Sequence, residues 1–172
     1  MTAARFFDGL HGKRIGFVGV GVSHRRLIEM FLEKGLQVLV CDKKSEQELG
    51  EAYETLSSKG AHFSLGEEYL SGLESCDVIF RTPGMYFYLP VLTRLREMGK
   101  VVTSEMEVFF DLCPCKKYAV TGSDGKTTTT TLISEFFKAA GRTVHLGGNI
   151  GRALLPEVER MSPDDIAVVE LS

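Results

Sequence analysis

The residues best suited to chemistry form a glycine-rich segment at residues 121–128, TGSDGKTT, between an apolar β-type run and a helical pattern. Glycines let backbone N–H groups turn inward around phosphate oxygens, and the N-terminus of a following helix adds partial positive charge. We expect Lys126 to reach the β- and γ-phosphates of a nucleotide and Thr127 to offer its hydroxyl to Mg²⁺. Val120 occupies the position of the first glycine in the G-x-x-x-x-G-K-[ST] pattern. A strand-to-helix turn without a ligand is the alternative interpretation.

A second glycine-rich segment, GVGVSH at residues 19–24, follows the apolar run of residues 14–20. Asp42 ends the next predicted strand, and an acidic residue about 20 positions beyond the first glycine commonly binds ribose hydroxyls. His24 stands where a dinucleotide-binding loop has its third glycine, which compromises the seat of the pyrophosphate. The pattern favours a nucleoside diphosphate, while a plain turn with Asp42 as a strand-end cap remains open.

Three further features lie at predicted strand ends or in loops. The Arg81-Thr82-Pro83-Gly84 turn ends a strand, at the edge where open α/β sheets bind ligands, although a Pro-Gly turn is often only scaffolding. The three glycines of GGNIG at residues 147–151 suggest that a backbone approaches something closely. Glu170 ends the apolar run IAVVEL and is a candidate Mg²⁺ ligand, or alternatively an exposed edge charge.

The cysteines and histidines do not form a metal-binding pattern. Cys113 and Cys115 are separated by one residue rather than by the two of a redox or zinc motif. We expect reduced, structural thiols and structural or surface histidines at these positions: Cys41, Cys76, Cys113 and Cys115, with His11, His24, His62 and His145.

The elements that position these residues alternate between strand and helix, which predicts an α/β protein. Residues 1–103 are interpreted as a Rossmann-like, doubly wound domain, and residues 104–172 as the start of a P-loop-type α/β domain. Strands are expected at 14–20, 36–41, 61–63, 77–81, 101–103, 117–121, 144–146 and 166–171, and helices at 24–34, 46–58, 126–140 and 153–160, with others beginning after residue 67 and at residue 90. Because the chain stops after an apolar run, we expect an N-terminal piece of a longer protein.

Composition excludes several classes of protein. The chain has 172 residues, 44% of them hydrophobic and 25% charged, so disorder is not expected. The 20 basic and 23 acidic residues give a net charge of −3, which argues against a nucleic-acid binder and leaves a small anionic ligand. Neither a membrane span nor a signal peptide is evident, so a cytoplasmic location is expected.

In order along the chain, GVGVS with Asp42, TPG, the SEMEVF segment, TGSDGKTT, GGNIG and ELS together resemble the Mur ligases. GGNIG and ELS point to the members that add D-glutamate. The resemblance implies an ATP- and Mg²⁺-dependent amide ligase of peptidoglycan precursor synthesis, which joins D-glutamate to UDP-N-acetylmuramoyl-L-alanine through an acyl phosphate. It also implies that the full-length enzyme is a monomer and that this chain alone is inactive, since the D-glutamate site would lie mostly beyond Ser172.

The resemblance further implies a role for each motif residue. Lys126 and Thr127 would be catalytic, and Thr127 and Glu170 would bind Mg²⁺. The ATP-binding residues would be Gly122, Ser123, Asp124, Gly125, Lys126, Thr127 and Thr128, with Asp124 standing where the family usually has Asn. The UDP-sugar would be held by Gly21, Val22, Ser23, Asp42, Lys43, Thr82, Pro83, Gly84 and Asn149.

Two other functions remain open from the residues. One is an NAD-dependent oxidoreductase built on the first domain, against which His24 argues. The other is a non-catalytic module that binds a UDP-sugar.

Overall fold

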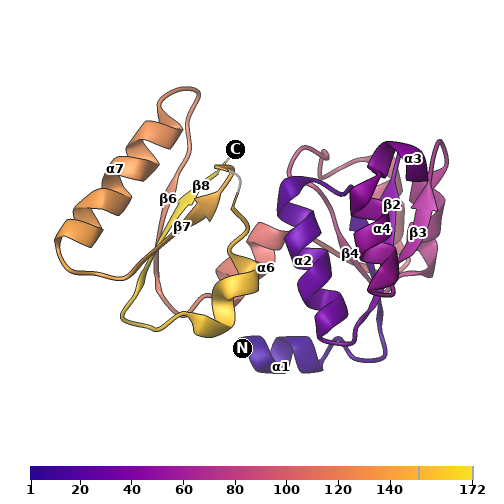
Figure 1. The fold of residues 1–172 in the computed structure, drawn as a ribbon, viewed down its shortest axis with the longest axis horizontal. Helices are drawn as coiled ribbons and strands as arrows, with labels where there is room; N and C mark the ends of the chain where they lie inside the picture. Colours follow the sequence, from indigo (N-terminus) through magenta and orange to yellow (C-terminus); the bar gives the residue numbers. More distant parts are fainter. Residues whose placement is uncertain (151, 172) are drawn as a thin grey trace. The chain divides into compact units, whose positions relative to one another are not determined.

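The computed structural model describes residues 1–150 and 152–171, without the side chains of Val22 and Ser23. Gly151 and Ser172, and those two side chains of the expected UDP-sugar set, therefore lie outside the described residues. The chain divides into two compact units (Figure 1). One unit is Arg5–Glu105, and the other is Met106–Ser172 together with Met1–Ala4.

The first unit is built on a parallel five-stranded sheet in the order β3-β2-β1-β4-β5. Its strands are β1 (Arg14–Val18), β2 (Gln37–Asp42), β3 (His62–Leu65), β4 (Val78–Phe80) and β5 (Val101–Thr103). The strand order reverses between β1 and β4, which is the switch point where ligands bind in doubly wound folds. The predicted Rossmann-like architecture is confirmed.

Helices cover both faces of this sheet. Helix α2 (Val22–Glu33) lies on one face, and the 3-10 helix η1 (Tyr69–Ser75) and α5 (Pro90–Glu97) lie on the other. The remaining helices of this part of the chain are α1 (Ala3–Asp8), α3 (Glu46–Leu49) and α4 (Glu51–Ser58). The single helix predicted over residues 46–58 is in fact two helices, because Gly50 adopts φ 51° and ψ −125° between them. The short α1 was not predicted.

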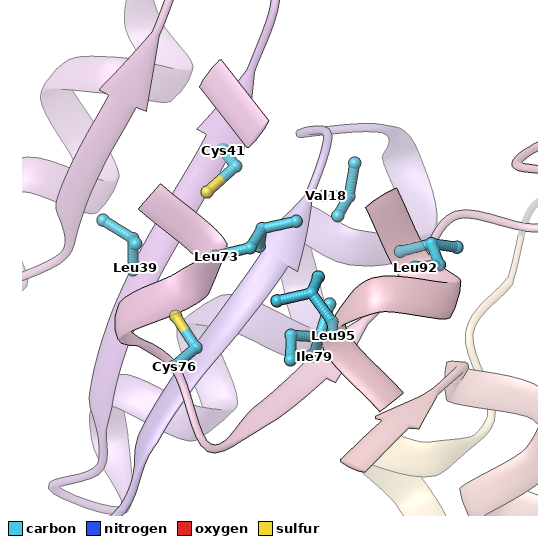
Figure 2. Packing of buried hydrophobic residues seen from close by; sticks show 8 residues of the cluster. All are labelled: Val18, Leu39, Cys41, Leu73, Cys76, Ile79, Leu92 and Leu95. Atoms are coloured by element: carbon cyan, nitrogen blue, oxygen red, sulfur yellow. The ribbon is translucent and has the colours of Figure 1, made fainter. Parts of the chain in front are cut away.

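Alternation along β1 divides the core between the two faces. Phe17 points to the α2 face, where its ring lies 5.2 Å from that of Phe31 and 4.9 Å from that of Phe80. Gly16 lies on the other face, where a Cβ atom would come within 2.9 Å of Cys76 Sγ. Figure 2 shows the apolar cluster of this second face, formed by Val18, Leu39, Cys41, Leu73, Cys76, Ile79, Leu92 and Leu95.

The second unit contains a three-stranded parallel sheet in the order β6-β8-β7. Its strands are β6 (Lys116–Val120), β7 (Val144–Gly148) and β8 (Ile166–Glu170), and its helical segments are α6 (Glu105–Leu112), α7 (Lys126–Ala139) and the 3-10 helix η2 (Leu155–Arg160). All five residues of the central strand β8 are buried, which accounts for its four apolar residues; the fifth, Glu170, is a buried carboxylate. The helix predicted over residues 153–160 is a shorter 3-10 helix.

No helix within the described residues has the length and apolar character that crossing a membrane requires.

Candidate functional site

The glycine-rich loop of the second unit connects β6 to α7. Gly122 and Gly125 have φ values of +147° and +72°, a region that side-chain-bearing residues rarely adopt. Lys126 folds back over the loop, and its Nζ donates hydrogen bonds to the carbonyl oxygens of Gly122 at 2.7 Å and Ser123 at 3.2 Å. Gly125 provides no side-chain cap to α7, a helix of 14 residues. The exposed loop thus presents an ammonium group and a helix N-terminus that suit phosphate groups.

Glu170 lies at the same edge of the sheet as this loop. It pairs in register with Val120, and Leu171 N–H donates to the Val120 carbonyl at 2.9 Å. Glu170 is only 4% exposed, and its Oε2 has no hydrogen-bond partner among the described residues. A buried carboxylate oxygen without a donor is costly, and a cation offsets that cost.

The donors at this edge fit a hard cation such as Mg²⁺, which prefers oxygen ligands. Glu170 offers a carboxylate oxygen, and Thr127 lies exposed in the first turn of α7. Two hydroxyls further along α7 bond to the helix itself: Thr130 donates to the Lys126 carbonyl at 2.7 Å and Thr131 to the Thr127 carbonyl at 2.8 Å.

The glycines of the GGNIG segment approach the protein's own backbone. A Cβ atom at Gly147 would lie 2.6 Å from the Arg152 carbonyl oxygen, and one at Gly148, where φ is +95°, would overlap the carbonyl oxygen of Glu170. Asn149 N–H donates to that same Glu170 carbonyl at 2.9 Å. Packing therefore accounts for these two glycines. The exposed Asn149 lies in the second unit beside Glu170, whereas the other residues predicted to bind the UDP-sugar lie in the first unit.

In the first unit, the carboxyl ends of β1, β2 and β4 converge at Gly19. Its φ is +82°, and a Cβ atom there would lie 3.1 Å from Thr82 Cγ2 and 3.9 Å from Asp42 Oδ2. Asp42 accepts the backbone N–H of Val20 on Oδ2 and that of Lys44 on Oδ1, both at 2.9 Å. The Asp42 carboxylate therefore caps the end of its strand, which was the alternative to ribose binding in the sequence analysis. Each carboxylate oxygen has a second lone pair, which can accept a hydrogen bond from a ribose hydroxyl.

His24 occupies the third-glycine position with a buried ring. It is 2% exposed and lies edge-on to Phe17 at 5.6 Å between ring centroids. Its Nδ1 lies 3.1 Å from the carbonyl oxygen of Gly19, so Nδ1 carries a proton and donates. Nε2 has no partner among the described residues, and burial lowers the pKa of the ring. A neutral imidazole therefore stabilises the loop through its hydrogen bond to the Gly19 carbonyl.

The remaining predicted sugar-nucleotide residues surround this point. Thr82 is half-buried, and the others are exposed: Gly21, Lys43, Pro83 and Gly84. The loop that follows, which no prediction included, exposes Tyr86, Phe87 and Tyr88. The Arg96 guanidinium stacks 3.8 Å over the Phe87 ring and donates to the Phe87 carbonyl at 2.9 Å. In the sequence, the run of three consecutive aromatic residues was the feature that could have indicated an exposed apolar loop here.

Cys115 and His145, which were predicted to be structural, lie close to Asp165 in the second unit. The ligand atoms of Cys115, His145 and Asp165 all lie within 4.8 Å of one another. Because these residues are 20 or more positions apart in the sequence, their spacing does not match a local metal-binding motif.

Comparison with known proteins was made for both sequence and fold. Residues 120–172 match the family model described as the Mur ligase middle domain. The chain is 48% identical over 160 residues to a protein of Clostridium kluyveri and 45% identical over 167 residues to one of Acetivibrio thermocellus, both named UDP-N-acetylmuramoylalanine--D-glutamate ligase. These matches cover 93% and 97% of the chain and 35% and 36% of the relatives. The chain thus spans about a third of the length of the curated relatives it matches.

Two solved structures share the fold. The structure of UDP-N-acetylmuramate:L-alanyl-gamma-D-glutamyl-meso-diaminopimelate ligase from Neisseria meningitides superposes with a TM-score of 0.53 at 19% identity, over 92% of this chain and 52% of that one. A murein peptide ligase from Psychrobacter arcticus gives 0.51 at 18% identity, over 92% and 37%. At these identities the matches support the α/β fold.

Proposed function

The chain is related to the Mur ligases, and from that premise we propose that it acts in the ATP-dependent joining of D-glutamate to UDP-N-acetylmuramoyl-L-alanine. This reaction is a step of peptidoglycan precursor synthesis. We infer that the proposed enzyme acts in the cytoplasm, as a monomer and without nucleic-acid or membrane partners.

One observation carries the proposal: a buried carboxylate with an unpartnered oxygen lies at the sheet edge from which the glycine-rich loop departs. We infer that Glu170 and Thr127 hold Mg²⁺ and that residues 122–128 hold ATP. Bound Mg²⁺ supplies neutralisation of the phosphate charge. Lys126, released from the loop carbonyls it now contacts, would stabilise the negative charge that develops on the transferred phosphoryl group.

The proposed chemistry follows from the poor reactivity of a carboxylate, whose leaving group would be oxide. Transfer of the γ-phosphoryl group to the alanyl carboxylate gives ADP and an acyl phosphate. The D-glutamate amine then attacks the acyl carbon, the C–O bond to phosphate breaks, phosphate leaves with the electron pair, and the amine loses a proton. Holding both reactants in line supplies much of the rate acceleration.

We infer that the switch point of the first unit binds the UDP-sugar through the residues predicted for it. Gly19 brings the three strand ends together, and the Asp42 carboxylate fixes the loop that would face the ligand. Asn149 joins this set only as a proposal, because it lies in the other unit.

Calorimetric titration of residues 1–172 with UDP-N-acetylmuramoyl-L-alanine, with NAD as the comparison ligand, tests the proposal. Saturable binding of the sugar nucleotide but not of NAD is expected. Binding of NAD alone would favour an oxidoreductase.

A second assay separates a ligase from a non-catalytic sugar-nucleotide module. Mg²⁺-dependent binding of ATP supports the ligase, and its absence supports the module. Since the relatives are about three times as long, residues 1–172 alone are not expected to release ADP when D-glutamate is added. Release of ADP under those conditions would contradict that part of the proposal.

A further inference from the structure

Three side chains that the proposed reaction does not use meet in the second sheet where its strands begin, at the end opposite to Glu170. Cys115 immediately precedes β6, Asp165 immediately precedes β8, and His145 is the second residue of β7. The three strands are parallel and in register, with Lys116 and Val144 both paired to Ile166. Parallel pairing therefore places the three side chains together where the strands begin.

The geometry of this cluster is close to that of a metal site. The Sγ of Cys115, a ring nitrogen of His145 and a carboxylate oxygen of Asp165 lie within 4.8 Å of one another. His145 Nε2 is 2.9 Å from Asp165 Oδ2. Tetrahedral zinc has bond lengths of about 2.0–2.3 Å, which separate neighbouring ligand atoms by roughly 3.3–3.8 Å. Shifts of an ångström or less would bring these atoms around one ion.

Burial and backbone contacts hold the three donors in place. Cys115 is 3% exposed, and the side chains of His145 and Asp165 are 16% and 14% exposed, which leaves a path for an ion. Ser162 N–H donates to Asp165 Oδ2 at 2.9 Å and fixes the carboxylate in its turn. The Sγ of Cys113 lies 3.5 Å from that of Cys115 and is a further donor near the site. Such outer contacts tune metal affinity.

We propose that Cys115, His145 and Asp165 form a binding site for a zinc-type divalent cation, separate from the proposed Mg²⁺ site. The donor set of sulfur, nitrogen and oxygen selects a borderline-soft ion over Mg²⁺, which prefers oxygen alone. A thiolate and a carboxylate balance the charge of the ion. The ion would tie together the beginnings of three strands that are separated along the chain.

Two of the donors have shifted pKa values in the metal-free protein. Burial, together with the neighbouring Cys113 thiol, raises the pKa of Cys115 to about 12, so Cys115 is a thiol in the metal-free protein. The hydrogen bond from His145 lowers the pKa of Asp165, which is a carboxylate. When a thiophilic ion binds, the thiol proton is released to solvent and the imidazole keeps its proton on the ring nitrogen that does not ligate.

The site is independent of the proposed ligase chemistry. Each of the three strands is five residues long, which separates the two sheet edges by about 15 Å at a rise of ~3.3 Å per residue. Failure of nucleotide binding therefore leaves this proposal standing, and the reverse also holds.

Titration of metal-free residues 1–172 with Co²⁺, followed by competition with Zn²⁺ against a chromophoric chelator, tests the proposal. Cobalt is expected to give a thiolate-to-metal charge-transfer band and visible bands of tetrahedral intensity at one equivalent. Zinc should abolish those bands and raise the temperature of unfolding. The absence of any thiolate band would overturn the proposal without recourse to a variant.

Variants assign the ligands. Cys115→Ser, His145→Gln and Asp165→Asn are each expected to weaken Zn²⁺ binding by at least about 100-fold, the upper end of what loss of a mere outer contact costs. Cys76→Ser and His62→Gln, a buried thiol and an exposed imidazole in the other unit, are the matched controls and should bind as the parent does. Circular dichroism verifies that each variant is folded. Parent-like affinity in folded Cys115→Ser would overturn the assignment.

Discussion

The backbone of Gly148 packs so closely against that of Glu170 that a Cβ atom at position 148 would overlap the Glu170 carbonyl oxygen. The two residues are also paired in register at the ends of β7 and β8. This contact fixes the backbone of Glu170, whose carboxylate has a buried oxygen without a hydrogen-bond partner among the residues described. Backbone packing at Gly148 thus positions the proposed Mg²⁺ ligand.

Replacing Gly148 with Ala should therefore damage both stability and the proposed metal site. Gly141→Ala is a matched control, because φ is +76° there and a Cβ atom would meet nothing within 4 Å. In the control, the free energy of unfolding should fall only by the cost of an alanine in the left-handed conformation, about 1 kcal/mol. In Gly148→Ala, the free energy of unfolding should fall by a further ~1–3 kcal/mol, because the added methyl group overpacks this contact. Equal losses in chemical denaturation would contradict the close contact.

Glu170→Gln should separate the cost of the buried charge from its use. The carboxylate is 4% exposed and has an oxygen without a partner, so the neutral amide should be cheaper to bury. In chelator, we expect the variant to unfold at a temperature equal to or above that of the parent. Magnesium ATP should raise the unfolding temperature of the parent but have little effect on the variant. A Mg²⁺-dependent rise of the same size in both would remove Glu170 from the metal site.

Lys126→Ala should weaken ATP binding by about 10- to 100-fold, from the ~1.5–3 kcal/mol that a hydrogen bond to a charged group contributes. Lys138→Ala, at the other end of α7 where the lysine pairs with Glu135, is the control for loss of a helix lysine. Titration with nucleotide measures both. Equal affinities for the two variants would show that the loop lysine does not contact the phosphates.

His24 should make the stability of the chain fall in mild acid. Burial lowers the folded-state pKa below 6.5, so the unfolded chain takes up a proton that the folded chain does not. As pH falls below 6.5, the free energy of unfolding should therefore drop, by at most about 1.4 kcal/mol per pH unit, until the pH reaches the folded-state pKa.

Urea unfolding at several pH values measures this slope. His24→Gln should flatten it, while His62→Gln, at an exposed position, should leave it unchanged. A slope that survives in His24→Gln would assign it to other groups.

Local sequence predicted most elements because strand, turn and helix signals act over a few residues. The apolar runs, the glycine stops and the alternation of the two were sufficient for the doubly wound fold of the first unit. The exceptions have local causes: Gly50 breaks one predicted helix into two, and α1 is too short for a periodic pattern. Motif order likewise indicated the loop at residues 121–128 as the place for phosphate.

The amino-acid sequence by itself thus determined the fold class, the family resemblance and the loops that are candidates for ligand binding. Only the tertiary structure decided what the residues at the strand ends contact. It showed that Gly147 and Gly148 accommodate the protein's own backbone and that both oxygens of Asp42 cap a loop. It also showed that a buried oxygen of Glu170 has no partner within residues 1–150 and 152–171. It also brought Cys115, His145 and Asp165 together. The physical reason is that parallel pairing aligns strand ends regardless of the length of chain between them, so such contacts leave no spacing pattern in the sequence.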